Sequence, residues 1–314
     1  MTFAVQTRQL SKRYRTQSES RPAIEGIDLE IAPGCLYGLV GPDGAGKTTT
    51  IRILATVMLP TSGTAYIAGL DVVRAAERVR PHIGYMPQDF SLYPDLSVRE
   101  NLEFFADLRG VPRARRQVRI AELLRFARLS EFQSRRSEHL SGGMRKKLAL
   151  ACALIHEPKV LLLDEPTTGV DPVSRRELWR LLAAVIQQGV TVLVSTPYMD
   201  EAERCHTIGM LYDGQLLTSG SPSELERRLP FSILELKARP RLAARQAVGA
   251  TDGVLAWHPV GDRLRLAVAD VQEVQPRLVA SLAQTGARAE FLRPSKATME
   301  DVFIHLVETE RGKA

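Results

Sequence analysis

The stretch that decides the fold of this chain is Gly41-Pro42-Asp43-Gly44-Ala45-Gly46-Lys47-Thr48. It matches the pattern G-x-x-x-x-G-K-[ST] at every fixed position, after an apolar run over 35–40 and before a helical pattern over 48–58. Glycines let backbone N–H groups converge on phosphate oxygens, and a helix N-terminus adds partial positive charge. The lysine of such a loop bridges the terminal phosphates, and the following hydroxyl reaches Mg²⁺. The stretch therefore predicts a phosphate-binding loop between a strand and a helix.

A second element is the apolar run over 160–163, which ends in Asp164 and Glu165. The run has the composition of a buried parallel strand, so both carboxylates are expected at the carboxyl edge of a sheet, where open α/β folds bind ligands. Asp164 suits a metal shell, and Glu165 is placed to polarise a water for in-line attack on a γ-phosphate. Alone the pair is a weak signal, because surface acids often follow a buried strand. Together with residues 41–48 it indicates a nucleotide site.

A third element is Leu140-Ser141-Gly142-Gly143-Met144, directly before a helical pattern over 145–155. Small residues and free N–H groups at a helix start can bind an anion. A simple serine N-cap followed by flexible glycines explains the same residues, and in isolation the stretch favours that explanation.

Composition limits the function classes. The chain has 314 residues, enough for one large domain or two ordinary ones, and its 42 basic residues are spread along it without an aromatic-interleaved basic motif. We therefore expect no nucleic-acid partner. Its three cysteines fit a reducing compartment, and the N-terminus lacks the features of a signal peptide. The longest apolar run, 148–155, is far shorter than the ~20 residues needed to span a bilayer, so any membrane role is expected through a partner.

The hydrophobic pattern predicts the organisation of the chain. Strands are expected over 3–5, 24–31, 35–40, 64–67, 160–163 and 191–195, a helical block over 97–155, and a helix over 175–188. The character changes around 221–229. Beyond it we expect strands over 232–237 and 263–268, and a last helix over 299–308 that a capping-box-like pair, Thr298 and Asp301, begins. The expected domains are 1–222, with a helical subdomain at about 92–156, and an α+β extension over 223–314.

These motifs, in this order, resemble an ABC-type ATP-binding cassette over residues 3–220. Residues 140–144 resemble the family signature, Tyr85-Met86-Pro87-Gln88 the Q-loop, and 166–172 the D-loop. Residues 299–303 are similar to the end of bacterial drug-exporter ATPases of the daunorubicin-resistance type, and 41–46 and 106–109 resemble the N-terminal half of tandem-cassette exporters. The resemblance implies an α/β fold: a RecA-like P-loop core, an antiparallel β subdomain, an inserted helical subdomain and a small α+β extension.

The resemblance also implies a function and its residues. The chain is expected to bind and hydrolyse ATP with Mg²⁺, on the cytoplasmic face of the inner (plasma) membrane, and to power export of drugs or other small hydrophobic compounds by a separate ABC permease. Glu165 and Gln88 are the expected catalytic residues, and Thr48, Gln88 and Asp164 the expected Mg²⁺ ligands. The expected ATP-binding residues are Tyr14 on the adenine, Gly41, Pro42, Asp43, Gly44, Ala45, Gly46, Lys47, Thr48 and Thr49.

A second cassette is the other implied partner. In a head-to-tail dimer, each nucleotide lies between residues 41–48 of one cassette and Ser141, Gly142 and Gly143 of the other. The sequence leaves open whether that dimer is a homodimer or a heterodimer, which substrate is carried, and what the extension does.

One residue departs from the family pattern. The strand after the D-loop ends in a switch histidine in the family, whereas this chain has Pro197, which offers neither a donor nor a titratable group. His206, nine residues further on, is a poor substitute and fits an ordinary surface or core position. We hypothesise that the chain's own site binds ATP but hydrolyses it slowly, with Ser141-Gly142-Gly143 completing a competent site on a second cassette. In the competing arrangement, a homodimer, Glu165 alone sustains turnover.

Other function classes fit less well. A translation-type cassette protein carries two cassettes in one chain, and a repair-type protein interrupts its cassette with a long coiled coil. This chain has one cassette and no sustained heptad tract. Pro197 keeps open a nucleotide-dependent regulatory subunit.

Overall fold

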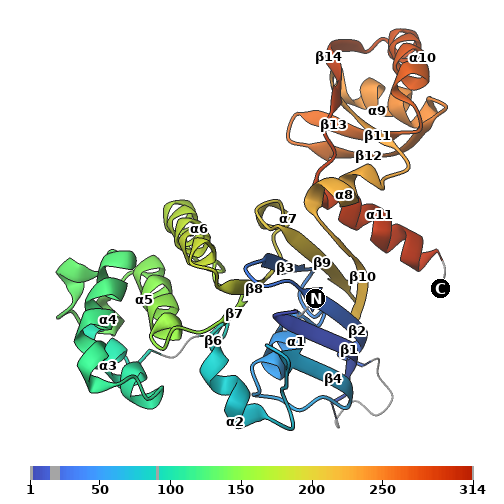
Figure 1. Cartoon of the computed structure of the whole chain (residues 1–314). Helices are drawn as coiled ribbons and strands as arrows, with labels where there is room; N and C mark the ends of the chain where they lie inside the picture. The colour runs from blue at the N-terminus through green and yellow to red at the C-terminus, as the bar shows by residue number, and fades with distance from the viewer. Residues whose placement is uncertain (1–2, 15–21, 90–91, 313–314) are drawn as a thin grey trace. The chain divides into compact units, whose positions relative to one another are not determined.

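The structure of the protein is a computed structural model that describes residues 3–14, 22–89 and 92–312. The ends of the two expected domains, residues 1–2 and 313–314, lie outside the described residues. The chain divides into two compact units, Met1–Pro222 and Ser223–Ala314 (Figure 1).

The centre of the first unit is a mostly parallel sheet of strand order β10-β9-β3-β8-β7-β6. Its middle strands are buried at every residue, as their continuous apolar sequences predict for strands covered on both faces. The carboxyl ends of parallel strands meet at one edge, so the residues that follow these strands share one end of the sheet. The strands are β3 (Leu36–Val40), β6 (Ile83–Met86), β7 (Val160–Asp164), β8 (Thr191–Thr196), β9 (Thr207–Tyr212) and β10 (Gln215–Gly220).

An antiparallel sheet of order β2-β1-β4-β5 forms the expected β subdomain. Its strands are β1 (Val5–Lys12), β2 (Ile24–Ile31), β4 (Ser62–Ile67) and β5 (Leu70–Asp71). The expected strand over 3–5 is wrong: β1 begins at Val5 and continues to Lys12, because it pairs with both β2 and β4. Its buried Thr7 hydroxyl lies 2.7 Å from Ile27 O and accepts from Leu29 N, which satisfies polar groups inside the sheet.

A helical block lies between β6 and β7 in the sequence and is drawn in green in Figure 1. It contains α3 (Val98–Leu108), α4 (Arg113–Phe126), α5 (Gly142–Leu154) and two single 3₁₀ turns (Ser130–Phe132 and Ser137–His139). A capping box formed by Ser97 and Glu100 begins α3. The other helices of this unit are α1 (Lys47–Leu54), α2 (Ala76–Val79) with the 3₁₀ turn Arg80–His82, α6 (Pro172–Gln187) and α7 (Met199–Ala202).

Several helix ends differ from the sequence expectation. The helix expected over 48–58 ends at Leu54, and Thr56 two residues later has a left-handed φ of 61°. The expected helix over 145–155 begins at Gly142, because the Ser141 side chain accepts from Met144 N and caps the helix. The helix expected over 175–188 begins at Pro172, where Asp171 is the N-cap. A capping side chain therefore starts both helices three residues earlier than the apolar periodicity alone indicates.

The second unit has its own sheet, of order β12-β13-β11-β14, and its own core of residues such as Leu234, Leu266 and Leu278. The predicted capping box of Thr298 and Asp301 is confirmed, and the helix that it begins continues to Arg311. The elements are α8 (Pro222–Arg227), β11 (Ser232–Arg239), α9 (Arg241–Ala250), β12 (Val254–Val260), β13 (Arg263–Val268), α10 (Val271–Gln284), β14 (Arg288–Ser295) and α11 (Met299–Arg311).

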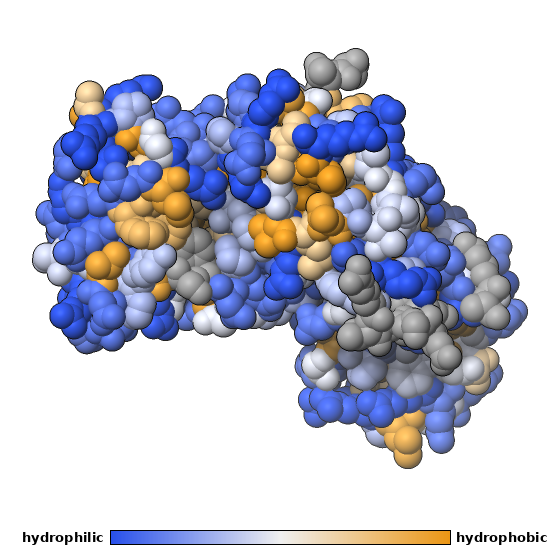
Figure 2. Space-filling view, turned by 90° about the horizontal axis from the view of Figure 1, so that it is seen from below, coloured by the Kyte–Doolittle hydropathy of each residue, from blue (hydrophilic) through white to orange (hydrophobic). Residues whose placement is uncertain are grey.

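Among the described residues, the structure contains no helix whose length and hydropathy would let it cross a membrane. Figure 2 shows a face covered mostly by hydrophilic residues, with hydrophobic residues gathered in patches between them. The thiols of Cys35, Cys152 and Cys205 are unpaired, and burial raises the pKa of each of them.

His156, just beyond α5, gives the fold a specific pH dependence. Its Nε2 lies 2.9 Å from Ile83 O, and burial lowers the pKa of the ring to about 4. The unfolded chain binds a proton at this histidine below its ordinary pKa of about 6.5, whereas the folded chain does so only below about 4. Folding stability is therefore lost as pH falls from about 6.5 to about 4, by at most about 1.4 kcal/mol per pH unit. In urea unfolding across this range, we expect His156→Gln, which keeps a donor for Ile83 O, to show a shallower loss than the natural chain. An equal loss of unfolding free energy in the two proteins over this pH range would contradict the assignment of the pH dependence to His156.

Candidate active site

The loop over 41–48 connects β3 to α1, and two of its glycines are required by close contacts. A Cβ at Gly41 would lie 2.1 Å from Leu211 O, so only glycine fits there. Gly46, the N-cap of α1, has φ 104°, and a Cβ on it would lie 2.6 Å from Ala23 O. These glycines hold the backbone close to neighbouring strands and leave the N-terminus of α1 open to an anion.

Lys47, Glu165 and Gln88 meet at the carboxyl edge of the parallel sheet. Lys47 is 3% exposed, and its Nζ donates to Gly41 O and Pro42 O at 2.8 and 3.0 Å. The same Nζ lies 3.4 Å from Glu165 Oε1, and Gln88 Nε2 donates to Glu165 Oε2 at 3.0 Å. The structure thus brings together a buried cation, a buried carboxylate and an amide from three segments that are far apart in the sequence.

Asp164 and Thr48 form the adjoining polar pair. The Thr48 hydroxyl donates to Asp164 Oδ1 at 3.0 Å, and Ser195 Oγ donates to the same oxygen at 2.7 Å. The other oxygen, Oδ2, is buried and has no hydrogen-bond partner among the described residues. A carboxylate oxygen left free beside a hydroxyl fits a divalent cation that keeps several waters and is otherwise held by phosphates. The residues present therefore fit Mg²⁺.

Tyr14 and Thr49 are also brought to this loop. The Tyr14 hydroxyl lies 3.3 Å from Thr49 Oγ1 and 3.5 Å from the sulfur of Met58. Thr49 is buried in the first turn of α1. Tyr14 therefore stands beside the helix that begins with Lys47.

Ser141, Gly142 and Gly143 lie elsewhere. In the described part of the chain, no hydrogen bond or ion pair joins them to the loop over 41–48. A Cβ on Gly143 would lie 2.2 Å from Ser174 Oγ, so this glycine allows the start of α5 to pack against the start of α6. Ser141 and Gly142 are exposed at the N-terminus of α5, where another molecule can reach them.

Pro197 directly follows β8, in a turn that does not use its backbone nitrogen. Tyr198 N donates to Thr196 Oγ1 at 3.1 Å, and Gly41 N donates to Thr196 O at 3.4 Å. His206 accepts through Nδ1 from Leu36 N, at the start of β3. The phosphate-binding loop follows the other end of that strand, so His206 has the structural role expected from its spacing.

Sequence reasoning missed three residues that hold Glu165 and Gln88. Glu165 has a left-handed φ of 47°, an uncommon conformation for a residue with a side chain, and its N–H donates to Ser195 Oγ at 3.0 Å. Thr168 Oγ1 donates to Glu165 Oε2 at 3.2 Å, and Lys146 Nζ donates to Gln88 O at 3.0 Å. Burial lowers the pKa of Lys146, against the opposing charges of Asp89, Glu165 and Asp164. Only the parallel pairing of β7 and β8, which sets Asp164 opposite Ser195, could have indicated one of them.

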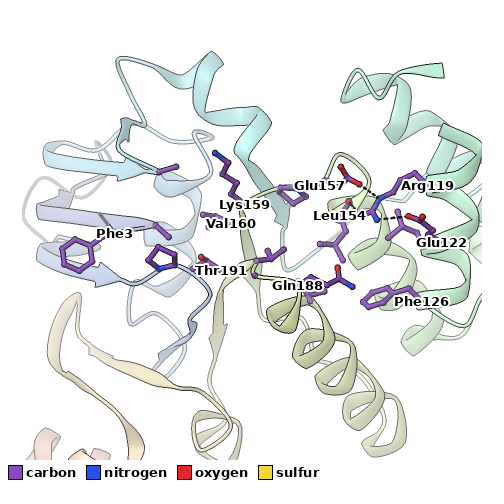
Figure 3. Close-up of a pocket in the computed structure, with 18 residues that line it drawn as sticks. Phe3, Arg119, Glu122, Phe126, Leu154, Glu157, Lys159, Val160, Gln188 and Thr191 are labelled. Atoms are coloured by element: carbon purple, nitrogen blue, oxygen red, sulfur yellow. Dashed lines mark hydrogen bonds and ion pairs between the residues drawn. The ribbon is translucent and has the colours of Figure 1, made fainter. Parts of the chain in front are cut away.

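A large cavity of about 780 Å³ lies away from this site. Figure 3 shows it between the helical block, which contributes Arg119 and Phe126, and the core, where Val160 and Thr191 line it. Val160 and Thr191 begin β7 and β8, so the cavity is at the opposite end of these strands from Glu165 and Pro197. Cavity size therefore does not locate the polar site.

Comparison with known proteins identifies the family. The family described as ABC transporter matches residues 24–168, all within the first unit. The daunorubicin resistance ATP-binding protein DrrA3 of Streptomyces coeruleorubidus is 36% identical over 310 residues, which are 96% of this chain and 94% of that protein. The chain belongs to the ABC transporter family. Its first unit contains the nucleotide-binding cassette of that family, and the predicted fold class is confirmed.

Two further comparisons show how far the likeness extends. The probable multidrug ABC transporter ATP-binding protein YbhF of Escherichia coli (strain K12) is 47% identical over 220 residues, which are 70% of this chain but only 38% of YbhF. The dimeric ATP-binding cassette MJ0796, in a post-hydrolysis state bound to ADP and Pi, has 28% identity and a TM-score of 0.63, over 69% of this chain and 98% of MJ0796. The cassette is thus the part with the widest likeness.

Proposed function

We propose that this chain binds and hydrolyses ATP with Mg²⁺ and powers an exporter of drugs or other small hydrophobic compounds. The observation that carries the proposal is the meeting of Lys47, Glu165 and Gln88 beside the Thr48–Asp164 pair. Three segments that are remote in the sequence, 47–48, 88 and 164–165, supply a cation, a base, an amide and a metal-binding pair at one edge of a sheet. This is the set of groups that phosphoryl transfer to water requires.

Each residue of the site has a chemical role in this proposal. Lys47 exchanges its two carbonyl acceptors and Glu165 for the β- and γ-phosphates, while residues 41–49 surround the phosphates and the N-terminus of α1 presents its backbone N–H groups to them. Tyr14 stacks on the adenine. Glu165 accepts a proton from the attacking water, and Gln88 orients that water. Domain 1–222 is thus the ATP-binding domain, and 223–314 is an extension without a catalytic role.

Thr48, Gln88 and Asp164 are the residues that would hold Mg²⁺. The metal supplies positive charge to phosphate oxygens whose negative charge grows during transfer. Ser195 keeps Asp164 oriented by the hydrogen bond to Oδ1, which leaves Oδ2 as the oxygen that would be offered to a cation.

A second cassette and a permease are the proposed partners, and no nucleic acid is proposed. The exposed Ser141 and Gly142 bind the phosphates held by a partner cassette. An aromatic cluster that begins soon after Gln88 offers a permease an apolar docking surface: Tyr93 is 45% exposed, and its ring centroid is 4.4 Å from that of Phe104. The link from Lys146 to Gln88 O connects this helical block to the site. The cassette would therefore work at the cytoplasmic face of the inner membrane.

Pro197 supports a dimer whose two nucleotide sites hydrolyse ATP at different rates. The site on this chain's own Lys47 and Glu165 holds ATP and turns it over slowly, while Ser141-Gly142-Gly143 completes a competent site on a heterologous cassette. Export of drugs is supported by the likeness to DrrA3 and YbhF. A chain that binds ATP without turnover in any assembly would instead be a nucleotide-dependent regulatory subunit.

ATP affinity tests the nucleotide site directly. We expect Lys47→Ala to raise the Kd for Mg²⁺–ATP at least about tenfold, because a charge-assisted hydrogen bond contributes about 1.5–3 kcal/mol. Lys159→Ala is the matched control, because Lys159 is an exposed lysine at the opposite end of β7 and should leave the Kd unchanged. Equal Kd values for the natural chain and Lys47→Ala, measured by titration calorimetry, would overturn the proposal.

A further inference from the structure

Glu201 is a buried carboxylate with no part in the chemistry described above. It lies in α7, four residues after Pro197, and is 0% exposed. A charge removed from water in this way is stable only when ion pairs and hydrogen bonds replace its hydration. Its partners therefore show what it holds in place.

Two of those partners lie on the loops that flank the active site. Glu201 Oε2 accepts from Thr167 Oγ1 at 3.0 Å and from Thr196 Oγ1 at 2.6 Å. Thr167 is in the loop that follows Glu165, and Thr196 is the last residue of β8, just before Pro197. One oxygen atom thus joins the loop over 166–170 to the turn over 196–198.

The other carboxylate oxygen is fixed by α6. Glu201 Oε1 accepts from Trp179 Nε1 at 3.3 Å and lies 3.4 Å from Arg175 Nε. The Arg175 guanidinium also lies 4.4 Å from the centre of the Tyr198 ring. One carboxylate oxygen of Glu201 is therefore bound to both loops, and the other oxygen is bound to α6. A displacement of either loop would displace the carboxylate, and with it the other loop.

Each loop continues directly into the catalytic groups. Thr168, next to Thr167, donates to Glu165 Oε2, and Thr196 O accepts from Gly41 N, the first residue of the phosphate-binding loop. A path of hydrogen bonds, with one covalent step from Thr168 to Thr167 and another within Thr196, thus runs from the carboxylate proposed as the base, through Glu201, to the loop proposed to hold the phosphates.

We infer that Glu201 is a positioning residue that sets the spacing between the loop over 166–170 and the turn over 196–198, and through them between Glu165 and the phosphate-binding loop. The role in turnover rests on the proposed ATP hydrolysis, whereas the mechanical tie between the two loops does not. Because the tie acts through Thr196, it is independent of the residue at position 197. It keeps the turn ordered although Pro197 has no N–H to contribute.

Hydrogen–deuterium exchange of the full chain without nucleotide tests the tie. We expect Glu201→Gln to speed exchange about tenfold in peptides covering both 166–170 and 196–198, because the amide presents a donor to threonine hydroxyls that need an acceptor. Glu203→Gln makes the same change at an exposed residue of the same segment and should leave both peptides unchanged. Unchanged exchange, or faster exchange in only one of the loops, would overturn the inference.

Kinetics test the consequence for the site. We expect Glu201→Gln to lower kcat about tenfold with an unchanged Kd for ATP and one nucleotide bound per chain, since small misplacements of catalytic groups are costly. A merely structural role would lower kcat and bound nucleotide together. Thr167→Val should lower kcat by itself, and the double variant should resemble Glu201→Gln, whereas additive effects would contradict the path.

If the natural chain releases no phosphate, the proposed hydrolysis fails, and the exchange measurement still decides on the tie. If Glu201→Gln does not fold, Thr167→Val carries both measurements.

Discussion

We expect the Glu165→Gln variant of the full chain to release phosphate at least about 100-fold more slowly than the natural chain, because a positioned general base contributes about 10²–10⁴-fold. The substitution preserves the size of the side chain and an oxygen that can accept from Thr168. It removes the group that can take a proton from water. The left-handed backbone at position 165, held by Ser195 Oγ, is compatible with glutamine to the same extent as with glutamate.

The Kd for ATP distinguishes the loss of the general base from damage to the nucleotide site. Glu165 lies 3.4 Å from Lys47 Nζ, so removing its charge leaves that cation more available to phosphate, and the Kd for ATP should stay equal or fall. Steady-state phosphate release and equilibrium binding on the same preparation check both expectations. A glutamine variant that turns over as fast as the natural chain would show that another group is the base.

The second large expected effect is an increase in the rate of phosphate release. We expect Pro197→His to raise phosphate release from the chain's own site about 10- to 100-fold, because a hydrogen bond to a charged group contributes about 1.5–3 kcal/mol and about 1.4 kcal/mol corresponds to a tenfold change in rate. The fold accepts the change, because the turn over 196–198 is held by Tyr198 N on Thr196 Oγ1 and by Gly41 N on Thr196 O. Neither bond involves the side chain or nitrogen of residue 197.

Pro197→Ala is the control for this gain. It removes the ring without adding a donor, so it should leave the rate where it is. If the histidine variant and the natural chain release phosphate equally, both alone and assembled with a second cassette and permease, Pro197 does not limit turnover and the holding-site proposal fails.

The two parts of the site that the residue pattern predicted share one property, which is that each is a contiguous stretch of sequence. Residues 41–48 are one contiguous motif, and Asp164 and Glu165 directly follow one short apolar strand, so both can be recognised from the chain order alone, although Gly41 and Gly46 make their close contacts with residues remote in the sequence. The position of the nucleotide site could therefore be predicted without knowing how the strands pair.

The supports of the site could not be predicted in this way. Ser195 reaches Asp164 only because β7 and β8 are parallel neighbours in one particular register, and Glu201 reaches Thr167 only because α7 folds back over the end of that sheet. Glu201 and the exposed Glu203 are indistinguishable in the sequence, two acids two residues apart, and burial alone separates them. Strand β1 was misplaced for a related reason, since its polar residues look like a loop until both pairing partners are known.

The raised pKa values of Cys35, Cys152 and Cys205 have a practical consequence. Thiols react as thiolates, so the buried Cys152 and Cys205 should react slowly with maleimide labels and thiol cross-linkers, and Cys35→Ser removes the remaining, partly exposed thiol. One cysteine in place of exposed Ser141 and another in place of exposed Asp43 would then be the reactive pair. A cross-link between two copies would report a homodimer directly, and its appearance only with a foreign cassette would identify the chain as half of a mixed pair.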